Sequence, residues 1–184
     1  MSMWYVVQVL HGHEDVMAGL ISSMMPAEQG VLQEIFSPSY ETERKARGRW
    51  YRCTRTLLPG YLIAITEYPD EVDRQLHELP EFARVLRRGE VCVPLSDAEV
   101  EVIGRDTVPG NRIVPMSAGV KDGETVVVTQ GPLKGHEGLI TRIDRRHSVA
   151  YVTFQMCGQA VSTRLGLAVM TSDKRIREDM RARV

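Results

Sequence analysis

Residues 126–140 read VVVTQGPLKGHEGLI and decide the fold of the C-terminal third of the chain. The first four are β-branched, which is typical of a strand. Gly131 then supplies a positive φ and Pro132 fixes the neighbouring φ, so the chain turns sharply. Two further glycines let the backbone reverse into a second apolar strand near Leu139. The pattern predicts two neighbouring strands joined by a turn that depends on glycine.

Similar short apolar runs recur through the rest of this third. Together with the two strands above they cover 124–128, 138–143, 149–154 and 159–163. Turns that contain glycine or charged residues separate them. Short strands at such regular spacing predict a small closed or nearly closed β-barrel.

The first hundred residues show both strand and helix patterns. The run 3–10 is apolar throughout, as in a strand buried on both faces. Residues 14–25 repeat apolar side chains at helical spacing. A second helix is expected from Pro69, and the capping box formed by Ser96 and Glu99 begins a third. A sheet with helices packed on it, followed by a small barrel, gives an α+β fold class.

Residues 104–119 carry turn residues without any periodicity. So long a stretch without a helix or strand would be unusual inside one compact domain, so it is predicted to be a linker. The predicted organisation is a first domain over 3–103, a linker over 104–119, a barrel domain over 120–172 and a basic tail over 173–184.

Charge differs between the two parts. Residues 1–119 hold twelve Lys and Arg against seventeen Asp and Glu, whereas residues 120–184 hold eleven against seven. Opposite signs indicate domains with different partners. No apolar run is long enough for a membrane span, and the N-terminus has no signal-peptide pattern, so a cytoplasmic protein without a membrane partner is expected. Three widely spaced cysteines imply no disulfide framework.

The sequence carries no recognisable catalytic motif. The glycine-rich turn at 131–138 lacks the Gly-Lys-Ser/Thr ending of a phosphate-binding loop, and it precedes a strand rather than a helix. His11 and His13 lie close together, but no cluster of Cys or carboxylates with metal-ligand spacing completes a site. We therefore expect neither an enzyme nor a cofactor or metal site.

The stretch 126–140 resembles the KOW motif, which occurs in NusG-type elongation factors and in several ribosomal proteins. The first domain separates these possibilities. Residues 3–9 (MWYVVQV), residues 56–63 (TLLPGYLI) and the helix start at Ser96 are similar to the NGN domain of the NusG family. The resemblance covers residues 3 to about 172 in the family's order of NGN domain, linker and KOW domain. It implies an antiparallel NGN sheet flanked by helices and an SH3-like KOW barrel.

Three departures favour a specialised branch of the family that is similar to LoaP. Leu133 replaces the aromatic residue that usually follows the KOW Gly-Pro, on the barrel face that docks Rho or a ribosomal protein in NusG. Leu57 and Leu58 replace an aromatic pair before Pro-Gly-Tyr. The segments 131–135 and 143–146 are closer to LoaP than to NusG. A LoaP-like factor implies processive antitermination directed by a leader RNA.

The resemblance implies a function by binding alone. In the family, the NGN domain sits on the clamp helices of RNA polymerase and suppresses pausing. Carried over by motif, Trp4, Leu58, Tyr61 and Ile63 line the apolar depression that receives the polymerase. The alternative is that these side chains are ordinary core. An apolar cluster interrupted by Pro-Gly is compatible with an exposed patch, and such patches mark interfaces.

Two basic sets are candidates for contact with nucleic acid. The stretch 44–55 holds six cations and two aromatic residues but no acid. Guanidinium groups pair with phosphates and rings stack on unpaired bases, which favours RNA; a solvated hairpin is the alternative. The first set is Arg44, Lys45, Arg47, Arg49, Trp50, Arg52 and Arg55. The second set, on the barrel, is Lys134, Arg142, Arg145 and Arg146.

The expected partners are RNA polymerase, a leader RNA or nascent transcript, and a ribosomal protein through the KOW domain. The protein is expected to be a monomer. Three alternatives stay open: a general housekeeping NusG-type factor, a ribosome-associated KOW protein that binds RNA, and a sequence-independent regulator of an enzyme. The second alternative explains the barrel but leaves the NGN-like half without a purpose.

Overall fold

The first strand, β1 (Met3–Val9), lies inside a four-stranded sheet, and its middle residues are buried, as its apolar run predicts. This computed structural model describes residues 2–170. β1 pairs antiparallel with β5 (Tyr61–Thr66) and β6 (Ala83–Val85), and β5 pairs antiparallel with β2 (Glu34–Phe36). The predicted antiparallel sheet of the first domain is confirmed.

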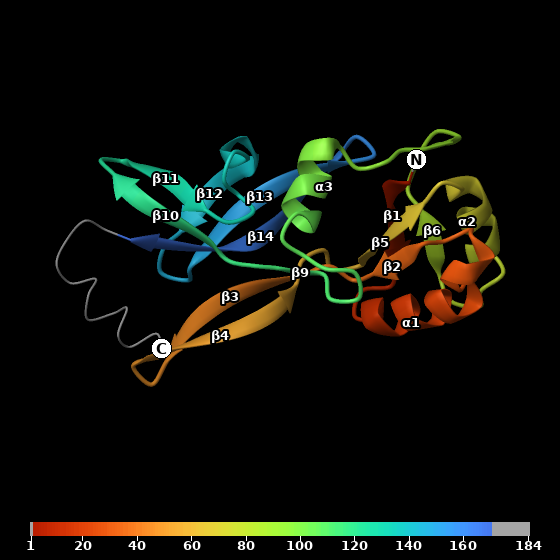
Figure 1. Ribbon diagram of the computed structural model, residues 1–184, viewed down its shortest axis with the longest axis horizontal. Helices are drawn as coiled ribbons and strands as arrows, with labels where there is room; N and C mark the ends of the chain where they lie inside the picture. Colours follow the sequence, from red (N-terminus) through yellow and green to blue (C-terminus); the bar gives the residue numbers. More distant parts are fainter. Residues whose placement is uncertain (1, 171–184) are drawn as a thin grey trace.

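Two helices, α1 (Glu14–Met24) and α2 (Pro69–Leu76), cover one face of this sheet (Figure 1). Both carry acidic residues in the first turn, where the helix dipole favours negative charge. Helices and sheet share one core, which includes Tyr5, Val7, Met17, Ile21, Leu62, Val72 and Leu76. Full burial of one such aliphatic side chain stabilises the fold by about 1.5–3 kcal/mol. The short elements of this part are η1 (Ala27–Gln29), β7 (Arg87–Arg88) and β8 (Val91–Cys92).

The opposite face of the sheet packs against a different set of residues. Because side chains alternate along a strand, Val6 and Ile63 point away from α1 and α2. They join a second core that also takes in α3 (Asp97–Gly104). This helix begins at the predicted capping box: the Ser96 hydroxyl accepts from the Glu99 N–H, and the Glu99 carboxylate accepts from the Ser96 N–H.

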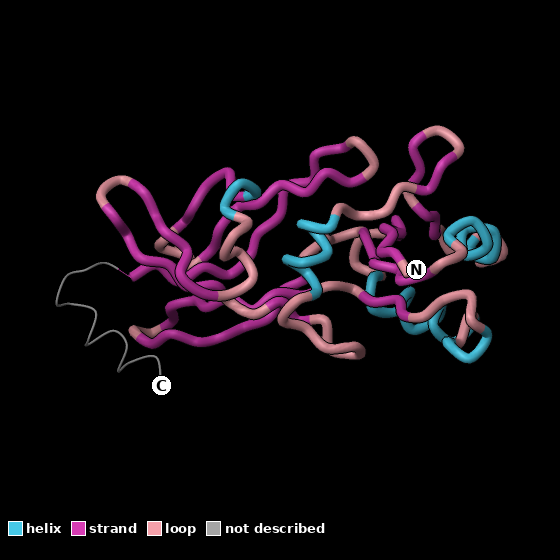
Figure 2. The backbone as a smooth tube through the Cα atoms, turned by 45° about the horizontal axis from the view of Figure 1, so that its top comes forward, coloured by secondary structure: helices cyan, strands magenta, loops and turns pink. Residues whose placement is uncertain are grey.

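The basic stretch forms an antiparallel hairpin of β3 (Ser39–Ala46) and β4 (Arg49–Thr56). Its two turn residues, Arg47 and Gly48, have φ values of 49° and 77°. Such turns match the right-handed twist of the strands that they join. The hairpin extends from the first domain toward the C-terminal strands, whereas α1 and α2 lie at the other end of the molecule and α3 lies between (Figure 2).

The C-terminal domain consists of five strands. They are β10 (Ser117–Asp122), β11 (Thr125–Gln130), β12 (Ile140–Asp144), β13 (Val149–Met156) and β14 (Gln159–Met170). The sheet order is β11-β10-β14-β13-β12, with β10 and β14 parallel and the other pairs antiparallel. A 3-10 turn, η2 (Glu137–Leu139), precedes β12. The sheet curls on itself, in agreement with the predicted small SH3-like barrel (Figure 1).

The turn after β11 depends on glycine, as the sequence predicts. Gly131 has a φ of +90°, and a Cβ atom there would lie 2.6 Å from the Cα atom of Ser117. The N–H of Leu133 donates to the Ser117 hydroxyl at 3.1 Å, and the Leu133 side chain is fully buried. The close approach of the turn to β10 therefore excludes any side chain at position 131.

The segment 104–119 is not the structureless linker that its sequence predicts. It contains β9 (Ile113–Val114), which pairs in parallel with β3, and the first residues of β10. Only two residues of the segment belong to β9 and three to β10, which is too few for a periodic sequence pattern. Their pairing partners lie far away in the chain, which is why sequence periodicity misses them.

Both domains contribute to the second core. From the first domain it includes Val6 and Leu58, and from the C-terminal domain it includes Phe154 and Leu165. Backbones also meet closely, because a side chain at Gly166 of β14 would collide with the carbonyl oxygen of Glu41 in β3. The two domains therefore lie in direct contact along β3, β14 and α3 (Figure 1).

Candidate binding surfaces

The four residues expected to form an exposed apolar patch lie together, but the patch is covered. Trp4 comes from β1, Tyr61 and Ile63 come from β5, and Leu58 precedes the Pro59–Gly60 turn. Leu58 and Ile63 are fully buried, whereas Trp4 and Tyr61 are half-buried. All four belong to or pack against the core that the two domains share. The expectation of an exposed patch is therefore wrong for this arrangement of the domains.

The core that buries this face includes residues of α3 and of the paired strands β13 and β14. Phe154 and Met156 of β13 lie in the same core as Leu58 and Ile63. Hydrogen bonds accompany the apolar contact: the Thr163 hydroxyl donates to the Leu57 carbonyl. Covering an apolar face in this way removes it from water, which favours the contact.

A buried carboxylate ties the same strands to α3. The N–H of Gln155 donates to Glu99 Oε1 at 2.5 Å, while Glu99 Oε2 completes the capping box. Glu99 is only 2% exposed. The Glu99 carboxylate thus caps the N-terminus of α3 and also binds β13 of the C-terminal domain. In the middle of α3, the Glu101 carboxylate lies 3.0 Å from the His136 ring across the domain boundary.

Trp4 has close neighbours within the first domain. Its ring meets that of Phe36 edge to face, with 5.5 Å between centroids. The guanidinium of Arg112 lies 5.2 Å from the Trp4 centroid. A Cβ atom at Gly104 would lie 2.9 Å from the Trp4 ring, so the last residue of α3 must be small. Trp4 therefore anchors the end of α3 as well as lining the covered face.

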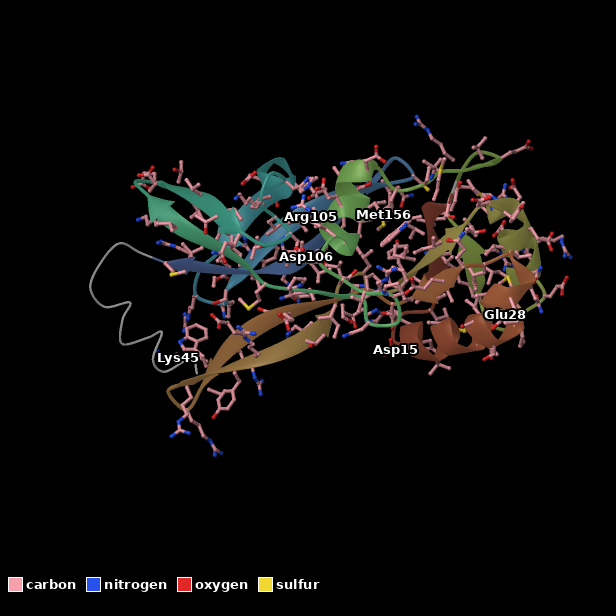
Figure 3. All side chains as sticks on the ribbon, viewed as in Figure 1. Asp15, Glu28, Lys45, Arg105, Asp106 and Met156 are labelled. Carbon is pink, nitrogen blue, oxygen red and sulfur yellow. The ribbon has the colours of Figure 1, made fainter. Side chains whose placement is uncertain are left out.

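The two basic sets lie on exposed backbone turns and strands. All of their cations are exposed, and Trp50 is half-buried. Figure 3 labels Lys45 near the free end of the β3–β4 hairpin. The Lys45 ammonium lies 5.8 Å from the centroid of Trp50, its cross-strand partner. Arg47, Arg49 and Arg52 continue the hairpin as solvent-exposed cations.

The structure brings part of the first basic set against part of the second. A pocket of 520 Å³ is lined by Arg44, Lys45, Trp50, Arg145, Arg146 and His147. The hairpin contributes the first three residues and the turn between β12 and β13 the last three. Two other members stay apart: Lys134 lies in the glycine turn, and Arg142 stacks on Tyr151 at 4.0 Å.

Sequence reasoning missed several residues at this contact. Ser148 is 2% exposed with a φ of +51°; its hydroxyl donates to Glu43 Oε1 at 3.0 Å, and its carbonyl accepts from the Thr42 hydroxyl. His147 bonds Asp144 through its ring and its N–H. These hydrogen bonds hold the pKa of Asp144 below its ordinary value. A single serine and histidine in a charged turn gave no sequence signal.

Residues 2–170 contain neither a candidate metal site nor a helix that could cross a membrane. No group of three or more His, Cys, Asp or Glu side chains in this range could hold a metal ion. Within the same range, no helix combines the length and the apolar character that crossing a membrane requires.

Comparisons with known proteins cover both domains. The family profile described as "Transcription termination factor nusG" matches residues 2–104, and the profile "KOW motif" matches residues 123–153. Two relatives carry the name "Transcription termination/antitermination protein NusG". The Campylobacter jejuni protein is 22% identical over 161 residues, which cover 85% of this chain and 89% of that protein. The Buchnera aphidicola protein is 25% identical over 166 residues, with coverage of 88% and 91%.

A solved structure has the same fold. The structure reported as "Domain interaction in Thermotoga maritima NusG" matches with a TM-score of 0.54 at 20% sequence identity. The match covers 90% of this chain and 94% of that chain. The fold of both domains, in the same order along the chain, is therefore shared with a solved protein.

Proposed function

Since this chain belongs to the NusG family of transcription termination factors, we propose that it is a transcription elongation factor that binds RNA polymerase through its N-terminal domain. It acts in the cytoplasm by binding and performs no catalytic step. The single observation that carries this proposal is the match of the whole N-terminal domain, residues 2–104, to the family.

The polymerase contact is proposed at the apolar face formed by Trp4, Leu58, Tyr61 and Ile63. Aromatic residues at the centre of an interface supply much of its binding energy, and Trp4 and Tyr61 are the two aromatics of this face. The clamp helices of the polymerase are the proposed partner, as the family resemblance implies. The apolar and aromatic side chains of the face suit such a contact, but the face lies in the core that it shares with α3, β13 and β14.

Binding to polymerase therefore requires the C-terminal domain to move away. We place the moving parts at 3–103 and 120–172, with 104–119 between them. The contact between them is partly polar, through Glu99 with Gln155 and Glu43 with Ser148, and water can replace such hydrogen bonds at little net cost. A domain interaction is also the reported subject of the related Thermotoga maritima NusG structure.

RNA contact is proposed on the hairpin, with processive antitermination directed by a leader RNA, as in a LoaP-like factor. Arg47 and Arg49 are exposed at its turn and Arg52 in the middle of β4, where guanidinium groups can reach phosphates. The KOW domain, once released, is free to dock a ribosomal protein. A general housekeeping factor would need little affinity for a particular leader.

A single-round transcription assay on templates with tandem terminators tests this function. With the leader present, the protein should increase readthrough at successive terminators, and scrambling the leader should remove the effect. The variant Arg47→Gln/Arg49→Gln/Arg52→Gln should bind leader RNA more weakly and with a smaller salt dependence. For each phosphate contact that is lost, fewer counterions are released when the RNA binds.

Two results would change the assignment. Equal effects on leader and scrambled templates would indicate a general NusG-type factor. Co-purification with ribosomal subunits in place of polymerase would favour the ribosome-associated alternative.

A further inference from the structure

The cleft between the hairpin and the C-terminal domain is strongly basic. Besides the 520 Å³ pocket there is a second pocket of 260 Å³, which shares Arg44 and His147 with the first. We call the two pockets together the interdomain groove. Besides Arg44, the cations of the groove are Lys45, Arg55, Arg145, Arg146 and Arg164.

The carboxylates of the groove are already engaged. Glu43 accepts from the Ser148 hydroxyl, and Asp144 accepts from the His147 ring at 2.8 Å. Within residues 2–170, Arg44, Lys45, Arg145 and Arg146 take part in no ion pair. The lining of the larger pocket holds these four cations and no carboxylate, so the pocket is positively charged.

The charge comes from both sides of a domain contact. Arg44 and Lys45 belong to the hairpin, whereas Arg145 and Arg146 belong to the turn after β12. Like charges across an interface oppose its formation. The contact forms nonetheless, held by Ser148 and by the apolar core. A polyanion in the groove would convert this repulsion into attraction for both domains at once.

Aromatic side chains indicate which polyanion fits. Trp50 lines the larger pocket and Tyr151 the smaller one, and both rings are half-buried. Rings beside guanidinium groups suit an unpaired nucleic-acid strand, because bases stack on rings while phosphates pair with arginine. A duplex would leave its bases unavailable for stacking. We propose that the interdomain groove is one binding site for an unpaired nucleic-acid strand, built jointly by the hairpin and the C-terminal domain.

This site rests on the proposed function in one respect, namely that the protein binds nucleic acid. It adds a coupling that the separate basic sets do not have. The groove is complete only while the domains are in contact, so a bound strand stabilises the closed arrangement, and opening weakens strand binding. Binding of polymerase and of a strand in the groove then oppose each other, and by linkage each weakens the other equally. The leader RNA of the proposed function contacts Arg47, Arg49 and Arg52, which lie outside the groove.

The test uses fluorescence anisotropy with the full chain and two labelled probes, a 12-nucleotide oligouridylate and the matching oligodeoxythymidylate. Arg44→Gln and Arg146→Gln, one on each side of the groove, should each weaken binding of the preferred probe several-fold and reduce the salt slope by about 0.7. The control Arg88→Gln/Lys121→Gln removes one cation from each domain outside the groove and should leave the affinity unchanged. The stronger of the two probes identifies RNA or displaced DNA as the ligand.

Opening the domains supplies the second arm. Gly166→Leu drives a side chain into the Glu41 carbonyl, whereas Gly138→Leu places the same side chain where nothing lies within 4 Å. Gly166→Leu should weaken probe binding several-fold, and Gly138→Leu should not. Loss of binding with Arg44→Gln alone, and full binding with Arg146→Gln and Gly166→Leu, would overturn the joint site but leave the hairpin contact of the proposed function intact. If the wild type binds neither probe, the groove assignment fails, while co-purification with polymerase still decides the proposed function separately.

Discussion

The Arg112 guanidinium and the Glu34 carboxylate form a bidentate ion pair. Arg112 Nε donates to Glu34 Oε1 at 3.0 Å, and Arg112 Nη2 donates to Glu34 Oε2 at 2.5 Å. The two side chains are 8% and 18% exposed. Arg112 also lies over the rings of Trp4 and Phe36. The pair therefore fixes the segment between the domains to the N-terminal sheet.

This ion pair predicts a pH dependence of stability. Burial alone would raise the pKa of Glu34, but hydrogen bonds from Arg112 and from the Gly110 N–H lower it below its ordinary value of 4.5. A lowered folded-state pKa contributes stability that is present above the unfolded value and is lost as the pH falls through the folded value. Glu34→Gln should therefore reduce the free energy of unfolding by about 2 kcal/mol at pH 7.

The difference between wild type and Glu34→Gln should shrink steadily below the ordinary glutamate pKa. Urea unfolding midpoints measured at pH 7 and at successively lower pH check this. A difference that stays constant down to pH 3 would show that the ion pair does not stabilise the fold.

The KOW turn gives a prediction with a built-in comparison. Gly131 and Gly135 have φ values of +90° and +84°, but only Gly131 lies against another backbone, that of Ser117. Alanine at either position pays the cost of a left-handed conformation, about 1 kcal/mol. Gly131→Ala should cost more than Gly135→Ala in thermal or urea unfolding, because the added methyl also meets Ser117. Equal losses would mean that the turn can move away from β10.

The domain boundary predicts an autonomous C-terminal fragment. All five strands of the C-terminal sheet lie within residues 117–170, and every pairing of that sheet is internal to this range. A fragment of residues 117–184 should therefore fold alone, since few backbone pairings cross the boundary. A well-dispersed amide NMR spectrum would bear this out, and a collapsed one would place the boundary elsewhere.

The sequence predicted the elements that local patterns encode. The apolar run of β1, the helical spacing of α1, the capping box at Ser96 and the glycine turn at Gly131 all have a local physical cause, and the structure contains each of them. The short strand β9 has no such cause, because its partner β3 lies some seventy residues away in the chain. Pairings of this kind depend on the assembled fold.

For the candidate surfaces too, the sequence predicted local features but not the contacts between distant segments. The composition of the stretch 44–55 identified a basic hairpin, but composition cannot show which other turn the hairpin meets. The roles of Ser148 and His147 at this contact depend on how the two domains pack, so the sequence alone does not predict them. The exposure of Leu58 was predicted from the first domain alone, and the C-terminal domain then covers it. Contacts between domains leave little trace in local sequence patterns.

If the polymerase binds at the proposed face, substitutions of Tyr61 and Tyr68 should differ in their effect on polymerase affinity. Tyr61→Ala should weaken binding to RNA polymerase by at least about tenfold, since removing an aromatic anchor from an interface centre costs about 2 kcal/mol or more. Tyr68 is 56% exposed and lies outside the covered face, so Tyr68→Ala should leave the affinity unchanged. Circular dichroism of both variants checks that the fold is retained. An equal loss of polymerase affinity in the two variants would show that Tyr61 is not part of the interface.

The affinity of Gly166→Leu for RNA polymerase core enzyme tests most directly the claim that the C-terminal domain covers the polymerase-binding face. A factor whose competent state is a tenth populated or less binds at least about tenfold more weakly than its open form. Gly166→Leu, which forces β14 away from β3, should therefore bind polymerase about tenfold more tightly than wild type, with Gly138→Leu unchanged. If Gly166→Leu binds polymerase no more tightly than Gly138→Leu and the wild type while its domains are shown to be apart, the covered face is not where polymerase binds.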